Sequence, residues 1–244
     1  MFTDIAIIFV ETSLIFLSAT ALALMAVGAV RAGLGLGRAA VALCALAASL
    51  ALWATAMGPL AKAGILMPPS TLMDPPFALM PLIGGAVILW SLGKLTITGR
   101  TVLSGLDQRH LMGFQVFRVM GAFFLIGWAT GDIPWEFALP AGVGDVLAGL
   151  AAMQALRALS KNAPDARAKV IRANVVGLAD FAVAVGTGIL TTEGFMHLLS
   201  LDAPNIINMY PLALFPAFIV PVFIAFHLFS LDALRRDKPV QVPA

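Results

Sequence analysis

Five ionisable side chains lie inside long apolar segments of the sequence: Glu11, Arg118, Asp145, Asp180 and His227. A charged group at membrane depth costs several kcal/mol, so such a residue normally faces the interior of a helical bundle and has a partner there. Residues of this kind handle protons, ions or solutes, or they hold helices together as buried polar contacts. The five residues are therefore candidates for a functional site, and each also has a purely structural interpretation.

The spacing along the sequence gives each of the five an expected depth in the bilayer. Arg118, Asp180 and His227 are each eight residues from a residue of one membrane face. At about 1.5 Å of helix rise per residue, all three lie roughly 12 Å above that face. Asp145 is expected near the midplane, and Glu11 in the outer third of the bilayer. Together they predict a polar track that runs from the inner third to the outer third.

Arg118 is the expected partner of an intramembrane acid, because a guanidinium can satisfy a carboxylate in bidentate geometry. Asp180 is the favoured partner because both residues have the same expected depth. Asp145 is the competitor, since it lies only about one helical turn higher. Gln115 shares a helix face with Arg118, and Asn174 lies on the same predicted helix as Asp180. Both are added to the candidate polar track.

The alternative interpretations of these residues remain open at the sequence level. The long side chain of Arg118 could extend to the headgroups. Glu11 could lie at a frayed helix end, and His227 could be a hydrogen-bonded packing residue. Asp145 shares a helix face with three small residues, Gly142, Gly149 and Ala152. Small residues let helices approach closely in membranes, so close helix packing is predicted at this position.

The composition shows what must position these residues. The chain has 244 residues, of which 60% are hydrophobic and 11% charged, and its mean hydropathy is +0.96. Water-soluble domains carry about 25% charged residues, so a soluble fold is excluded. Segments of about 20 apolar residues span a bilayer. The sequence predicts an all-α, polytopic membrane bundle, a single domain over 1–244, with seven transmembrane helices at about 5–30, 38–58, 77–94, 111–131, 138–157, 170–190 and 208–231.

The basic residues predict the orientation of this bundle. Lys62 lies on one side and Arg118 within a helix, whereas thirteen of the fifteen Lys and Arg residues fall on the other side: Arg31, Arg38, Lys94, Arg100, Arg109, Arg157, Lys161, Arg167, Lys169, Arg172, Arg235, Arg236 and Lys238. Basic residues accumulate in short cytoplasmic connections. We therefore predict an outside N-terminus and a cytoplasmic C-terminus, in a cell membrane (the inner membrane if the source is bacterial).

Several classes of function lack the residues that they require. The basic residues lie in short connections between apolar segments, so no nucleic-acid partner is predicted. Retinal is not expected as a cofactor, because no helix centre carries a lysine for a Schiff base, and no other cofactor is identified. Cys44 is the only cysteine, which excludes an intramolecular disulfide. Methionines near the outer face would suit Cu(I), but they form no compact repeat. No metal site and no catalytic residues are predicted.

Three functional hypotheses follow, the first of which is favoured. The chain is a small transporter or ligand sensor whose polar track handles protons or a small polar solute. Alternatively, it is a non-catalytic subunit or assembly factor of a membrane protein complex, with the lipid bilayer and other subunits as its partners. The third hypothesis, an enzyme acting on a lipid or quinone, is weakened by the lack of a paired histidine and acid.

Overall fold

The computed structural model describes residues 1–236, and every regular element in that range is helical. Lys238, one of the basic residues used to predict orientation, lies outside the described residues. The elements are α1 (Phe2–Arg31), α2 (Leu36–Lys62), η1 (Met80–Gly84), α3 (Gly85–Leu95), α4 (Ile97–Ser104), α5 (Gln108–Gln115), η2 (Val116–Ala122), α6 (Phe123–Ala129), α7 (Trp135–Ser160), α8 (Ala166–Thr191), η3 (Phe215–Ile219) and α9 (Val220–Arg236).

Six helical segments are long and apolar enough to cross a membrane. They are α1, α2, α7, α8 and two composite helices, one formed by α5, η2 and α6 and the other by η3 and α9. A seventh candidate is the pair Met80–Leu95 and Ile97–Ser104, which is bent by 84° at its break. The predicted multi-pass helical membrane bundle is confirmed, with six or seven spans by this criterion.

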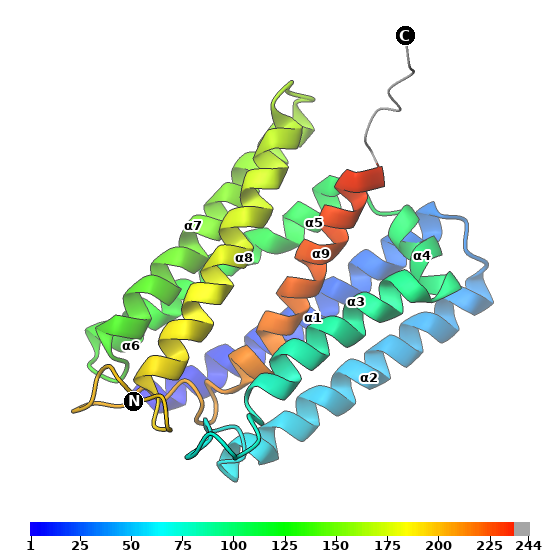
Figure 1. Ribbon diagram of the computed structural model, residues 1–244. Coiled ribbons are helices and arrows are strands. Elements are labelled where there is room, and N and C mark those ends of the chain that lie inside the picture. Colours follow the sequence, from blue (N-terminus) through cyan, green and yellow to red (C-terminus); the bar gives the residue numbers. More distant parts are fainter. Residues whose placement is uncertain (237–244) are drawn as a thin grey trace.

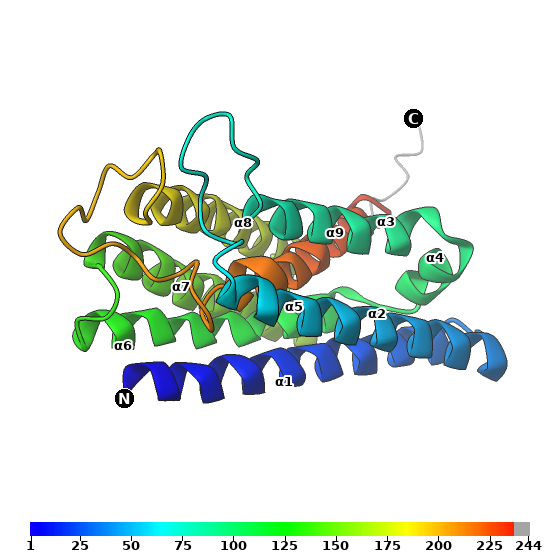
Figure 2. The same cartoon turned by 90° about the horizontal axis from the view of Figure 1, so that it is seen from below.

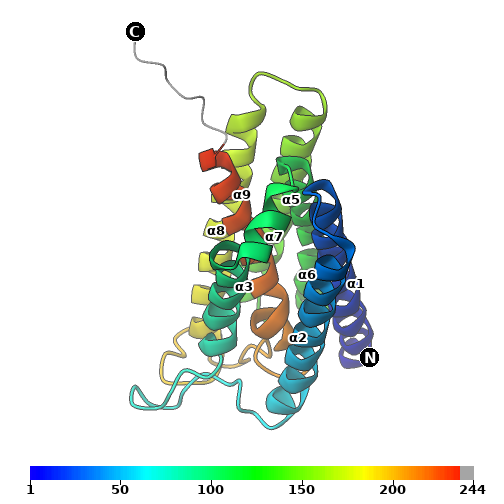
Figure 3. The same cartoon turned by 90° about the vertical axis from the view of Figure 1, so that its right-hand side faces the viewer.

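The path of the chain favours seven crossings. The N-terminus and the end of α9 lie at opposite ends of the bundle (Figures 1 and 2), which requires an odd number of passes. The end of α2 and the start of α5 are also at opposite ends, and η1 with α3 runs between them (Figures 1 and 3). The segment from Met80 to Leu95 is therefore the crossing, and α4 turns aside at its far end.

All seven predicted helices begin at somewhat different residues in the structure, and a local feature accounts for three of these shifts. The third begins at Met80 rather than 77, and the seventh at Phe215 rather than 208. Both begin with a π-helical turn whose second residue is a proline, which has no amide hydrogen for a helical hydrogen bond. The fourth begins earlier, at Gln108, because the Asp107 carboxylate caps the first amides of α5. The short helix α4 was not predicted.

Helix α9 is the central element of the bundle. It packs against α3, α5 and α8, and Figure 1 shows it between the α7–α8 pair and the group formed by α1, α2 and α3. Its phenylalanines join those of α5 and η3 in a buried aromatic core in which Phe114 stacks on Phe226 with ring centroids 4.0 Å apart. Because lipid is as apolar as these rings, their close packing rather than burial from water stabilises the core.

A reporter that is active only outside the membrane would test the topology. We expect activity when it is fused after residue 66 or 200, and silence after residue 35, 104 or 165. The physical reason is the excess of basic residues in the connections that contain the second set of positions. An active fusion after residue 104 would contradict the crossing by η1 and α3, and with it the seven-pass arrangement.

Candidate functional site

Arg118 lies at the centre of a buried cluster of polar side chains. It is only 1% exposed, and its guanidinium has partners on α7, α8 and α9. Nε donates to Asp145 Oδ1 at 2.8 Å, one terminal nitrogen donates to Gly177 O at 2.7 Å, and the other is paired with both Asp145 and Asp180. The expected pairing with Asp180 is present, but Asp145 shares the same guanidinium, so the two acids are not alternatives.

The local backbone allows this cluster to form. Arg118 is carried by η2, a stretch of 3₁₀ helix within a longer helix, a feature that often marks a functional hinge. Three glycines let the neighbouring backbones approach, since a Cβ on any of them would collide with a cluster side chain. Gly121 faces Asp145, Gly144 faces Asp180, and Gly177 faces His227.

His227 is held as a neutral hydrogen-bond acceptor for Arg118. Asn174 Nδ2 donates to Val170 O and to Ser230 Oγ, so the Asn174 oxygen is the atom that faces His227 Nδ1, at 2.9 Å. His227 Nδ1 must then carry the proton, which leaves Nε2 free to accept from Arg118 at 3.4 Å. The histidine is fully enclosed and adds no formal charge to the cluster in this arrangement.

The hydrogen bonds continue from His227 toward the C-terminal end of α9. Ser230 Oγ, which accepts from Asn174, donates to Gln108 Oε1 at 2.7 Å, and Gln108 Nε2 donates to Ser230 O at 2.8 Å. A continuous polar chain therefore links the first turn of α5 to Arg118 through α9 and α8. It extends the predicted polar track beyond His227 toward the first turn of α5.

Asp107, the residue directly before Gln108, stays ionised. Burial raises the pKa of Asp107, but the charge of His110 and hydrogen bonds from His110, Arg31 and Arg109 bring it below its usual value. The charged carboxylate caps α5 and so fixes the position of Gln108.

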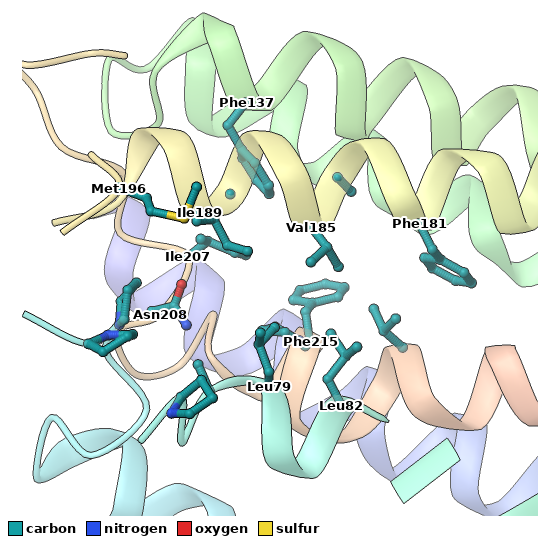
Figure 4. A pocket seen from close by; sticks show the side chains of 18 of the residues that line it. Leu79, Leu82, Phe137, Phe181, Val185, Ile189, Met196, Ile207, Asn208 and Phe215 are labelled. Carbon is teal, nitrogen blue, oxygen red and sulfur yellow. The ribbon is translucent and has the colours of Figure 1, made fainter. Parts of the chain in front are cut away.

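A cavity of about 210 Å³ lies between α7, α8, η1 and η3, in the half of the bundle that holds the N-terminus of α1. Figure 4 shows Phe137, Val185 and Phe215 around its middle, with Asn208 and Met196 toward one end and Phe181 at the other. Asp145 also lines the cavity, two turns further along α7 than Phe137, and is the only charged residue among the described ones that do. An apolar chamber therefore ends at a carboxylate of the buried cluster.

Two loops, the one after α2 and the one after α8, cover the far end of this cavity. Pro69 of one loop and Phe195 of the other line it and are joined by a hydrogen bond of 2.9 Å between the Phe195 amide and Pro69 O. Below the loops, the π-helical turns η1 and η3 contact each other and contribute lining residues. Turns of this kind occur frequently at functional sites.

Two of the predicted site residues do not join the cluster. Glu11 is exposed on α1, and Tyr210 donates a hydrogen bond of 2.6 Å to its carboxylate. Glu11 lies outside the cluster, because α1 packs against α2, α4, α5 and η3, whereas α7, which carries Asp145, packs against η2 and α8. A track that continues to the outer third through Glu11 stays a prediction. Gln115 is buried but donates to Phe223 O at 3.0 Å instead of to Arg118. Arg118, Asp145, Asp180, His227 and Asn174 are brought together.

Sequence reasoning missed the inner polar chain and the cavity walls. Ser230 is three residues after His227 and so shares its helix face, a signal that could have identified it. Phe181 follows Asp180 directly, and its ring lies 3.6 Å from the Arg118 guanidinium carbon. The remaining lining residues come from loops and π-helical turns, for which helical periodicity gives no signal.

The cluster has one more acid than base. Arg118 contributes one positive charge, Asp145 and Asp180 contribute two negative charges when both are ionised, and within 1–236 no other cation forms an ion pair with either acid. The site therefore has a formal charge of −1 unless a proton or a bound cation neutralises it. No group of three or more His, Cys, Asp or Glu side chains in the described part of the chain could hold a metal ion.

These features define a multi-pass helical membrane protein with a buried arginine–aspartate cluster beneath an apolar cavity. The chain belongs to the family of the domain of unknown function DUF8737, whose model matches residues 75–235. The match begins just before η1 and includes the whole charged cluster, whereas α1 and α2 precede it. No curated protein and no solved structure matches the chain.

Proposed function

We propose that this protein is a transporter or sensor in which a proton on the Asp145–Asp180 pair is coupled to a solute in the outer cavity. The observation that carries the proposal is the position of Asp145, which both lines the cavity and shares Arg118 with Asp180. Any solute that reaches the end of the cavity changes the surroundings of a carboxylate whose charge is not fully balanced. Solute binding and proton binding at that carboxylate are therefore linked.

The surroundings of the cluster support the coupling of proton binding to solute binding rather than catalysis. His227 does not line the cavity and is hydrogen bonded on both ring nitrogens. The cavity wall itself provides a single carboxylate and mostly apolar side chains among the residues described. Acid–base catalysis usually places a second polar group beside the first, and the lining residues supply no histidine for that role. Binding and release of a solute require only the groups that are present.

Infrared spectroscopy of the protein in lipid nanodiscs tests the proton. We expect a carbonyl band of a protonated carboxylic acid that shifts in deuterated water and weakens as the pH rises. The band should disappear in Asp145→Asn and in Asp180→Asn, because the remaining acid is then balanced by Arg118. Glu11→Gln, which removes an acid outside the cluster, should leave it unchanged. A band that is absent, or that does not respond to pH while the protein stays folded, would refute the coupling.

A further inference from the structure

We infer that the solute is a lipophilic organic cation, an ammonium ion with an apolar body, and that it exchanges for the proton at Asp145. This inference rests on the proposed function and adds the chemical class of the solute. The sequence alone suggested a small polar solute, for which the apolar cavity offers few hydrogen-bonding partners. The argument uses the walls of the cavity, its charge and its size.

The walls of the cavity suit an ammonium ion. Four phenylalanine rings line it, those of Phe124, Phe137, Phe181 and Phe215. Aromatic faces attract cations through their quadrupole, most strongly where water is excluded, and aromatic cages recognise quaternary ammonium groups. One such cation–π contact is present in the structure, because the Arg118 guanidinium lies over the ring of Phe181. The same rings provide an apolar surface for the rest of the solute.

The charge of the cluster selects for a cation. The groups that face Asp145 are Arg118 from η2 and Asp180 from α8, with neutral His227 from α9 behind the guanidinium. One negative charge remains on this set when no proton is bound. A neutral solute leaves that charge uncompensated in a low-dielectric site, and an anion adds to it, which is costly. An ammonium ion near Asp145 compensates it and makes the proton unnecessary.

The size of the cavity sets the size of the solute. A volume of about 210 Å³ corresponds to roughly seven water molecules at about 30 Å³ each. It therefore fits a small ammonium ion or the charged end of a longer amphiphile. Benzyltrimethylammonium is a suitable probe because its charge is permanent. Neopentylbenzene is its matched control, in which carbon replaces nitrogen and the shape is retained.

The test is equilibrium dialysis of both probes against the protein in zwitterionic nanodiscs, with empty nanodiscs as background. We expect the ammonium to bind about tenfold more tightly than its neutral analogue, the ratio for roughly 1.4 kcal/mol of cation recognition. This preference should be lost in Asp145→Asn and kept in Glu11→Gln. Affinity for the ammonium should rise by up to about tenfold per pH unit, because each bound cation displaces one proton.

A second variant separates binding from folding and from the proton. Val185→Trp fills the middle of the cavity away from the charged cluster. It should prevent ammonium binding while the infrared band of the protonated acid remains. Equal affinity for the two probes would overturn the cation assignment and leave the proton coupling standing. A preference that survives Asp145→Asn would overturn the site, and pH-independent ammonium binding would overturn the exchange.

Discussion

Replacing Arg118 by methionine is expected to destabilise the protein by about 3–5 kcal/mol, the range found when one partner of a buried ion pair is removed. Asp145 and Asp180 share the same guanidinium, so both lose their cation at once. The backbone carbonyl of Gly177 and the His227 ring nitrogen also lose their donor. The measurement is chemical or thermal unfolding of the protein in detergent, compared with the wild type.

The single acid variants should be affected less. In Asp145→Asn or Asp180→Asn, Arg118 keeps the other carboxylate, so the loss is expected to be about 1–3 kcal/mol for the weakened hydrogen bonds. Adding both asparagine substitutions to Arg118→Met should recover part of the stability, because no unbalanced charge then remains. Losses that simply add in the triple variant would contradict a shared cluster.

Arg172→Met is the control for this series. Arg172 is exposed and donates a hydrogen bond of 2.7 Å to Gln154 Oε1. Removal of an exposed arginine of this kind usually changes stability by no more than about 0.5 kcal/mol. A loss comparable to that of Arg118→Met would mean that any arginine removal destabilises the bundle, irrespective of the cluster.

Gly121→Ala is expected to have the second large effect, a loss of about 1–3 kcal/mol together with loss of solute binding. A Cβ at this position would overlap the carboxylate and the Cβ of Asp145. Because the obstacle includes the base of the side chain, rotation of the carboxylate alone cannot relieve the overlap. Helix α7 must shift away from η2, and the hydrogen bonds between Asp145 and Arg118 are then disrupted.

Gly113→Ala is the matched control on the same composite helix. Apart from its chain neighbours and the backbone of its own helix, no atom lies within 4 Å of a Cβ placed there. Alanine favours helix by up to about 1 kcal/mol over glycine, so stability should be unchanged or slightly raised. Unfolding and benzyltrimethylammonium binding would be measured for both variants. Equal behaviour of the two would show that the close approach of η2 and α7 at Gly121 has no role in holding Asp145.

The class of protein could be predicted from the sequence because it depends on composition and order along the chain. Long apolar segments separated by short connections require a helical membrane bundle, since only such a structure satisfies backbone groups in lipid. The uneven distribution of lysine and arginine predicts the orientation for an equally local reason. The rarity of charge in these segments singled out Arg118, Asp145 and Asp180, because an ionisable residue in lipid requires a partner.

The tertiary structure decided which of these residues meet and what lies beside them. Helix rise gives the depth of a residue but not its direction around the helix axis, so Glu11 and Asp145 were equally plausible members of one track. The structure separates them, because α1 packs against α2, α4, α5 and η3, whereas α7 packs against η2 and α8. The competition between Asp145 and Asp180 disappears for a related reason. A guanidinium donates in several directions, and only the packing of η2 against α7, with α8 within reach of the Arg118 side chain, shows that it meets two acids at once. The cavity has walls from loops, π-helical turns and four α-helices, and a volume shared by so many segments has no pattern in the sequence of any one of them.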